Sequence, residues 1–228
     1  MGAEAPTRRA TLTLLLLLAV PTPLPAASGD GPVAAALTEA LVIGAERAVA
    51  ELGRPDGFLG DPDVHIPLPG VLAQARSALA LVGMAGLADD LEVRLNRAAE
   101  QAVPVAGELL VQAIRGLTFG DAIEILRGPE DSATRYLDRA TGDELALRMR
   151  PVVDDALAQA GAVQALDALA GQYARLPFVS GLRADLTGPV LDYARRAIFG
   201  RLGDEEARIR EDPAARTTDL LRRVFGQR

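Results

Sequence analysis

The sequence predicts an all-α protein, a single-domain irregular helical bundle of about eight or nine helices. Apolar residues recur every three or four positions along almost the whole chain, and no run alternates apolar with polar residues as a half-buried strand would. The apolar stripes are rich in small residues, which permits close helix packing. Because the chain has five Phe, three Tyr and no Trp, we expect Leu and Val to fill the core.

The first half of the chain contains the longest break in this helical pattern. Apolar spacing predicts a first helix over 33–52. Residues 53–70 are rich in Gly and Pro, which stop that helix and predict an extended, turn-rich segment. A short helix is expected over 72–82, followed by a helix over 87–102, which Pro104 either kinks or separates from a new helix.

The second half has more explicit start and stop signals. Thr118, three residues before Asp121, predicts a two-turn helix that ends at Gly128. Thr141 and Glu144 have the spacing of a capping box and predict the start of a longer helix. The other predicted elements are a kink at Pro151, a helix over 166–173, a loop over 177–188, a helix over 190–209 and a last turn or two over 217–225.

The first 27 residues have the pattern of a secretory signal peptide. Arg8 and Arg9 precede an apolar run of about nine residues, whereas a membrane-spanning helix needs about 20. Ordinary export of the unfolded chain is the preferred route, with the twin-arginine route as the alternative. Later apolar stretches are interrupted by charge, so we expect residues 28–228 to form one soluble all-helical domain, periplasmic or secreted, without a membrane span.

The composition excludes several kinds of site. With no Cys and with His65 as its one histidine, the chain cannot form a Cys/His zinc site or a thiol active site. No serine lies in a Gly-x-Ser-x-Gly motif, and the absence of Lys excludes a Walker loop. A net charge of −7 disfavours nucleic acid and anionic membranes as partners. We therefore expect no cofactor, no metal and no assignable catalytic residue.

The Gly- and Pro-rich segment carries a group of polar residues. Asp56, Asp61, Asp63 and His65 lie close together in it, but their spacing does not match a calcium-binding EF-hand loop. Asp residues are also common in turns, which explains most of this pattern without a ligand. Asp56, Phe58 and His65 are the candidates for a binding loop.

Polar residues on two predicted helices form a second candidate group. Asn96, Arg97 and Glu100 lie on a face away from the apolar stripe of their helix, and Glu46 lies away from the stripe of its own. Two interpretations are open. Either these faces are solvated helix surface, or a second layer of protein covers them and the residues form a buried polar network or line a pocket.

Several strings of the chain match a known pattern. They are Gly44-Ala45-Glu46, Asp56-Gly57-Phe58-Leu59, Val64-His65-Ile66-Pro67, Asn96-Arg97-Ala98-Ala99-Glu100, Ala133-Thr134-Arg135-Tyr136 and Arg216-Thr217-Thr218-Asp219. Together they resemble the bacterial domain-of-unknown-function family 4197, and the resemblance spans essentially the whole mature chain. It implies an exported, all-helical protein and carries over no activity and no catalytic residues.

The same resemblance implies that the family retains the positions of Glu46, Asp56-Gly57-Phe58, Asn96, Arg97, Glu100 and Arg216. Such retention suggests a shared role, either as a structural network or as a ligand site. In a structural role, Arg216 would tie the C-terminal segment to a carboxylate such as that of Glu100 or Glu206.

The first functional hypothesis is a non-catalytic binding or interaction protein of the cell envelope. Its partner would be a small molecule, a peptide or an envelope protein, held in a groove near residues 53–70 and the face of Asn96 and Glu100. One alternative is a hydrolase of an envelope polymer with Glu46 and Glu100 as acid and base, which requires both carboxylates in one accessible cleft. The other is a purely structural module, in which the polar groups satisfy one another and leave no cavity.

Overall fold

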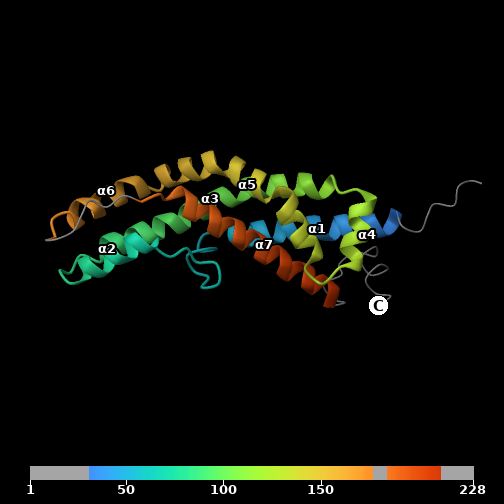
Figure 1. Cartoon of the computed structure of the whole chain (residues 1–228), viewed down its shortest axis with the longest axis horizontal. Helices are drawn as coiled ribbons and strands as arrows, with labels where there is room; N and C mark the ends of the chain where they lie inside the picture. Colours follow the sequence, from blue (N-terminus) through green and yellow to red (C-terminus); the bar gives the residue numbers. More distant parts are fainter. Residues whose placement is uncertain (1–30, 177–183, 212–228) are drawn as a thin grey trace, which may run out of the picture.

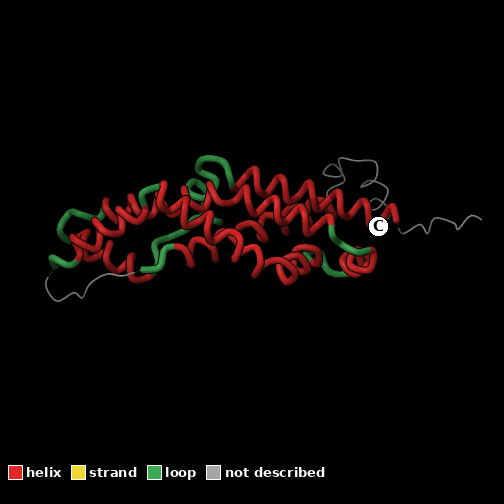
Figure 2. The backbone as a smooth tube through the Cα atoms, turned by 90° about the horizontal axis from the view of Figure 1, so that it is seen from above, coloured by secondary structure: helices red, strands yellow, loops and turns green. Residues whose placement is uncertain are grey.

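The structure, a computed structural model, describes residues 31–176 and 184–211, and it is helical without strands in these ranges (Figures 1 and 2). The all-α prediction is therefore confirmed. Seven helices occur in the described residues: α1 (Gly31–Leu52), α2 (Gly70–Ala80), α3 (Gly86–Arg115), α4 (Phe119–Arg127), α5 (Ser132–Gln159), α6 (Ala162–Tyr173) and α7 (Thr187–Glu211).

The helices form an elongated bundle in which α3 is central. It packs against α1, α2, α5, α6 and α7. Figure 1 shows α2 and α6 beside the start of α3 at one end of the molecule, and α1 and α4 at the other end. A continuous cluster of buried Ala, Leu, Val and Ile side chains runs through the bundle. Within the described ranges, no helix combines the length and apolar character needed to cross a membrane.

Small residues allow the helices to approach closely, as their abundance in the stripes predicts. Gly107 of α3 is the clearest example, because a Cβ atom there would lie 2.8 Å from a methyl carbon of Val49 on α1. The contact fixes how α1 lies along α3, and hence where the segment that follows α1 begins.

Two internal prolines neither end nor divide their helices. Pro104 lies inside α3 and Pro151 inside α5, and both helices continue past them. Buried residues flank each proline, for example Val103 and Ala106 around Pro104. Packing on both sides offsets the single backbone hydrogen bond that a proline removes. The alternative of a new helix at Pro104 is therefore wrong.

The predicted start of α4 is confirmed. The hydroxyl of Thr118 accepts a hydrogen bond from the backbone N–H of Asp121 at 3.2 Å. The Asp121 carboxylate in turn accepts one from the backbone N–H of Thr118 at 2.9 Å. This reciprocal pair satisfies two N–H groups at the helix start.

The predicted capping box at Thr141 and Glu144 is wrong. The helix that contains them, α5, begins at Ser132, and the Thr141 hydroxyl donates to the carbonyl of Leu137 at 2.7 Å inside it. Seven of the predicted helices occur in the described residues, because α3 continues past Pro104 as one helix. The expected leader over 1–27 and the last helical turns over 217–225 lie outside the described residues.

Candidate functional site

The Gly- and Pro-rich segment over residues 53–69, here called the loop, forms a second layer over α3. Phe58 and Ile66 are fully buried, and Val64 and Leu68 are almost so. A tight turn starts the loop, because a Cβ atom at Gly57 would lie 2.4 Å from the carbonyl oxygen of Leu52. The loop covers the polar face of α3, so the interpretation of that face as solvated surface is wrong for the residues beneath it.

Asn96 of α3 binds the far part of the loop. Its side-chain oxygen accepts a hydrogen bond from the backbone N–H of Ile66, and its amide nitrogen donates to the carbonyls of Ile66 and Glu92, each at 2.9 Å. The Asn96 side chain has no solvent exposure. An asparagine suits this position because its amide both accepts and donates, like a backbone partner in a sheet.

Glu100 binds the near part of the loop, one helical turn from Asn96. One carboxylate oxygen accepts hydrogen bonds from the backbone N–H groups of Phe58 and Leu59, at 3.2 and 3.3 Å. The other accepts from Arg97 at 2.8 Å. The residue is only 4% exposed. Its buried charge is therefore balanced by three donors, as a buried carboxylate requires.

Arg97 links this carboxylate to a second one at the surface. Its other terminal nitrogen donates to Asp56 at 2.7 Å. Hydrogen bonds with Glu100, which has the larger effect, and with Asp56 raise the pKa of Arg97 above its ordinary value. Asp56 also has a positive φ of 63°, so the ion pair holds a backbone geometry that is uncommon for a residue with a side chain.

His65 makes a fourth contact between the loop and α3. Its Nε2 lies 2.7 Å from a carboxylate oxygen of Glu92, and its Nδ1 lies 3.3 Å from the carbonyl oxygen of Leu59. Both neighbours are acceptors, so only a ring protonated on both nitrogens can donate to both. The structure thus brings together six of the sequence candidates: Asp56, Phe58, His65, Asn96, Arg97 and Glu100.

The structure does not bring Glu46 to this cluster. Glu46 is exposed and lines a different, mainly apolar groove of about 490 Å³ between α1 and α3. The end of α1 lies near Glu100, because a Cβ atom at Gly53 would lie 3.6 Å from the Glu100 carbonyl oxygen. Glu46 comes seven residues earlier in the chain, which corresponds to a helical rise of about 10 Å. Arg216 lies outside the described residues, and the two carboxylates expected to bind it have other partners.

Arg201 of α7 is an anchor of the loop that the sequence analysis missed. Its guanidinium forms ion pairs with Asp61 of the loop, with Glu51 at 3.6 Å and with Asp204 at 3.5 Å. Burial opposes the charge, but the carboxylates of Asp61 and Glu51 outweigh this effect and raise the pKa of Arg201. No local signal marks Arg201, because its loop partner is 140 residues away in the chain.

Two further buried carboxylates, Glu205 and Glu206, lie on α7, and the sequence analysis named only Glu206, as a possible partner of Arg216. Glu206 accepts hydrogen bonds from the backbone N–H groups of Ala133 and Thr134, at 3.1 and 2.9 Å, and from Arg210 at 2.8 Å. It therefore caps the start of α5 from α7, a helix that is distant in sequence but packs against α5. Glu205 pairs with Arg208 and, at 3.3 Å, with Arg47 of α1.

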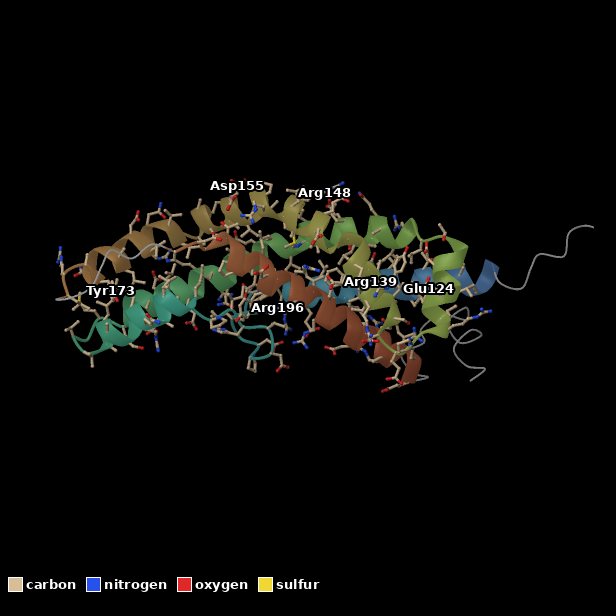
Figure 3. All side chains as sticks on the ribbon, in the orientation of Figure 1. Glu124, Arg139, Arg148, Asp155, Tyr173 and Arg196 are labelled. Carbon is tan, nitrogen blue, oxygen red and sulfur yellow. The ribbon has the colours of Figure 1, made fainter. Side chains whose placement is uncertain are left out.

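A hollow of about 400 Å³ lies between the loop and α7. Figure 3 shows Arg196 on α7 at this side of the molecule. The guanidinium carbon of Arg196 lies 4.4 Å from the centre of the Tyr193 ring, a cation–π contact. The residues that line the hollow are Asp63, Val64, Tyr193, Arg196, Ala197, Gly200, Arg201 and Asp204.

The arrangement separates two kinds of polar group. The cluster around Asn96 and Glu100 is closed, because its donors and acceptors bind one another or the loop backbone. The hollow beside α7 is open and has charged groups of both signs at its rim. Among the described residues, no group of three or more His, Asp or Glu side chains is placed to hold a metal ion.

Comparisons with known proteins give one match. A family model described as "Protein of unknown function (DUF4197)" matches residues 28–226. No curated protein and no solved structure matches the chain.

Proposed function

The chain belongs to the DUF4197 family, and we propose that it is a non-catalytic binding protein of the cell envelope whose ligand site is the hollow between the loop and α7. The observation that carries the proposal is the hollow itself, about 400 Å³ in volume and lined by aromatic, apolar and charged side chains. Its size and mixed lining are typical of sites for small molecules.

The anchoring of both walls supports a binding role. Arg201 belongs to α7 and pairs with Asp61 of the loop, so one guanidinium joins the two sides of the hollow. On its opposite side the loop is held to α3 by Asn96 and Glu100. A site with fixed walls loses little conformational freedom when its ligand binds, which favours affinity.

The buried carboxylates support a non-catalytic role. Glu100 and Glu206 each hold two backbone N–H groups and one arginine. Such contacts occupy the oxygens that an acid or base would use. Glu46 and Glu100 lie in different surroundings, so no observation favours the alternative of a hydrolase that pairs them.

A structural role accounts for the Asn96–Glu100 cluster but not for the hollow. The cluster has the mutual satisfaction expected of a structural network, and it keeps the loop on α3. A purely structural role does not explain an open depression that is lined by Arg196, an arginine without an ion pair among the described residues. We therefore assign the cluster to support of the site and the hollow to the ligand.

Envelope localisation rests on the leader pattern over residues 1–27. Expression of the full chain in a bacterium, followed by mass analysis of the periplasmic fraction, tests it. The expected result is a periplasmic chain that starts near residue 28, and an unprocessed cytoplasmic chain would contradict the assignment.

Binding is tested by nuclear magnetic resonance with residues 28–228 and four classes of probe. These are short alanine-based peptides, succinate, inorganic phosphate and putrescine. We expect at least one class to shift the backbone signals of 61–64 and 193–204. Shifts confined to Val49 and Gly107 would show that the ligand binds in the groove between α1 and α3 instead. The absence of any shift with all four classes would contradict the proposed function.

A further inference from the structure

The charges around the hollow point to the chemical class of its ligand. Asp63, Arg196, Arg201 and Asp204 all line it, so both signs are present in one depression. A ligand with one kind of charge would meet repulsion from half of these groups. The charges that can bind a ligand are those that no other side chain already pairs.

Arg201 is not free, because carboxylates surround it. Glu51, Asp61 and Asp204 all lie within ion-pair distance of its guanidinium. It neutralises part of their charge and supports the wall of the hollow. Its role is to position the loop, not to hold a ligand.

Arg196 and Asp63 are different. Within the part of the chain that the structure describes, Arg196 has a ring contact with Tyr193 but no ion pair, and the carboxylate of Asp63 has no hydrogen-bond donor. Both side chains are exposed, and they line the same hollow without pairing with each other. Two opposite charges that form no ion pair with each other therefore line one depression.

The hollow is also lined by apolar and aromatic side chains. Val64 and Ala197 are buried side chains at its edge, and the Tyr193 ring lies under Arg196. Gly200 is also a lining residue, and a Cβ atom there would meet no heavy atom within 4 Å. The hollow thus offers room and an apolar surface in addition to its two unpaired charges.

We propose that this hollow binds a small zwitterion, namely a free amino acid or a short peptide with both ends unblocked. Arg196 holds the carboxylate through charge-assisted hydrogen bonds, and Asp63 holds the ammonium group. Tyr193, Ala197 and Val64 pack against the body of the ligand. This inference rests on the proposed function and specifies the ligand of the same site.

The test uses four forms of one dipeptide and residues 28–228. L-alanyl-L-alanine is compared by isothermal titration calorimetry with its N-acetyl form, its C-terminal amide and the form blocked at both ends. We expect the free dipeptide to bind at least about tenfold more tightly than either singly charged form, because each blocked end removes one charged contact. Equal binding of all forms, tighter binding of a singly charged form, or no binding of the free dipeptide overturns the inference.

Point variants assign the two ends. In Arg196→Gln, the free dipeptide is expected to lose its advantage over the amide. In Asp63→Asn, it is expected to lose its advantage over the N-acetyl form. If both variants keep both advantages, the assignment of the ends is wrong and the inference falls.

A matched pair of glycine variants tests the location. Gly200→Leu places a side chain in the hollow, whereas Gly171→Leu places one on α6, and a Cβ atom at either glycine meets nothing within 4 Å. Gly200→Leu is expected to abolish binding, and Gly171→Leu to leave it unchanged. If the N-acetyl form binds best and Gly200→Leu abolishes that binding, the zwitterion inference fails while the proposed function stands.

Discussion

The side-chain amide of Asn96 pairs with both backbone polar groups of Ile66, accepting from its N–H and donating to its carbonyl, each at 2.9 Å. Both residues are fully buried. The pair closes the loop onto α3 across 30 residues of sequence.

Replacement of Asn96 by alanine should therefore destabilise the protein strongly. Two buried backbone groups of Ile66 lose their partners, which costs about 2–4 kcal/mol of unfolding free energy. Urea denaturation measures this loss, and hydrogen exchange at the Ile66 amide shows whether the loop has opened. Gln101→Ala, at an exposed position on the same helix, is the control and should change stability little. Slow exchange at Ile66 in Asn96→Ala would contradict the anchoring role.

Glu100 should be more sensitive to truncation than to loss of charge. Glu100→Ala leaves the N–H groups of Phe58 and Leu59 unpaired and Arg97 without its buried partner, at a cost of about 2–4 kcal/mol. Glu100→Gln keeps an oxygen that can accept from the loop, so its cost should be smaller. Thermal and urea unfolding compare the two variants. An equal loss in both would show that charge, not the loop hydrogen bonds, dominates this site.

The neighbouring arginine gives an independent check of the network. Arg97→Ala should lower the melting temperature clearly, because it leaves Glu100 with a buried charge and removes the restraint on Asp56. An unchanged melting temperature would mean that Arg97 is not part of a stabilising network.

Local pattern predicted the helices whose ends are set by nearby residues. The stop of α1 at Leu52 follows from the glycines and prolines after it, and the start of α4 follows from the pairing of Thr118 with Asp121. Periodicity also placed Asn96 and Glu100 on a face separate from the core stripe. It could not show what covers that face, because the covering loop contributes backbone N–H groups, which every residue except proline possesses.

Long-range partners explain what the sequence did not predict. The start of α5 depends on Glu206, more than 70 residues further along the chain. Periodicity gives the angular position of Glu46 on its helix but not how far along α3 that helix lies. Arg201 resembles other surface arginines in the sequence, and its importance comes from three carboxylates that the fold collects around it.

The cap of α5 can be tested through Glu206. In Glu206→Ala, the N–H groups of Ala133 and Thr134 lose their acceptor, and Arg210 loses a buried partner, so we expect a loss of about 3–5 kcal/mol. The first turns of α5 should fray, and Thr141 should then become the effective helix start that local pattern predicts. Hydrogen exchange over 132–140 measures this change. Glu211→Ala, at an exposed position of α7, is the control, and equal protection of 132–140 in both variants would contradict the capping role.

Asp121 gives a prediction for pH dependence. Hydrogen bonds from the side chain and then the backbone of Thr118, with a smaller contribution from Tyr136, lower the pKa of Asp121 below its ordinary value of 3.8. The stabilisation is therefore fully present above pH 3.8 and is lost as the pH falls through the lower folded-state pKa. Titration of the Asp121 carboxyl signal by nuclear magnetic resonance measures the value. Thr118→Val should raise this pKa more than Tyr136→Phe, and the reverse order would contradict the assignment of causes.

Gly107 should be intolerant of even one added carbon. A Cβ atom there lies 2.8 and 3.0 Å from the two methyl carbons of Val49, so Gly107→Ala must push α1 away from α3 or distort Val49. Overpacking of this kind costs about 1–3 kcal/mol, more than the roughly 1 kcal/mol that Ala gains over Gly in a helix. Gly200→Ala meets no such contact, so it should stabilise the chain. The double variant Val49→Ala/Gly107→Ala removes the clashing methyl groups and should recover part of the loss in urea denaturation. If Gly107→Ala is instead as stable as Gly200→Ala, the close approach of α1 and α3 does not limit this position.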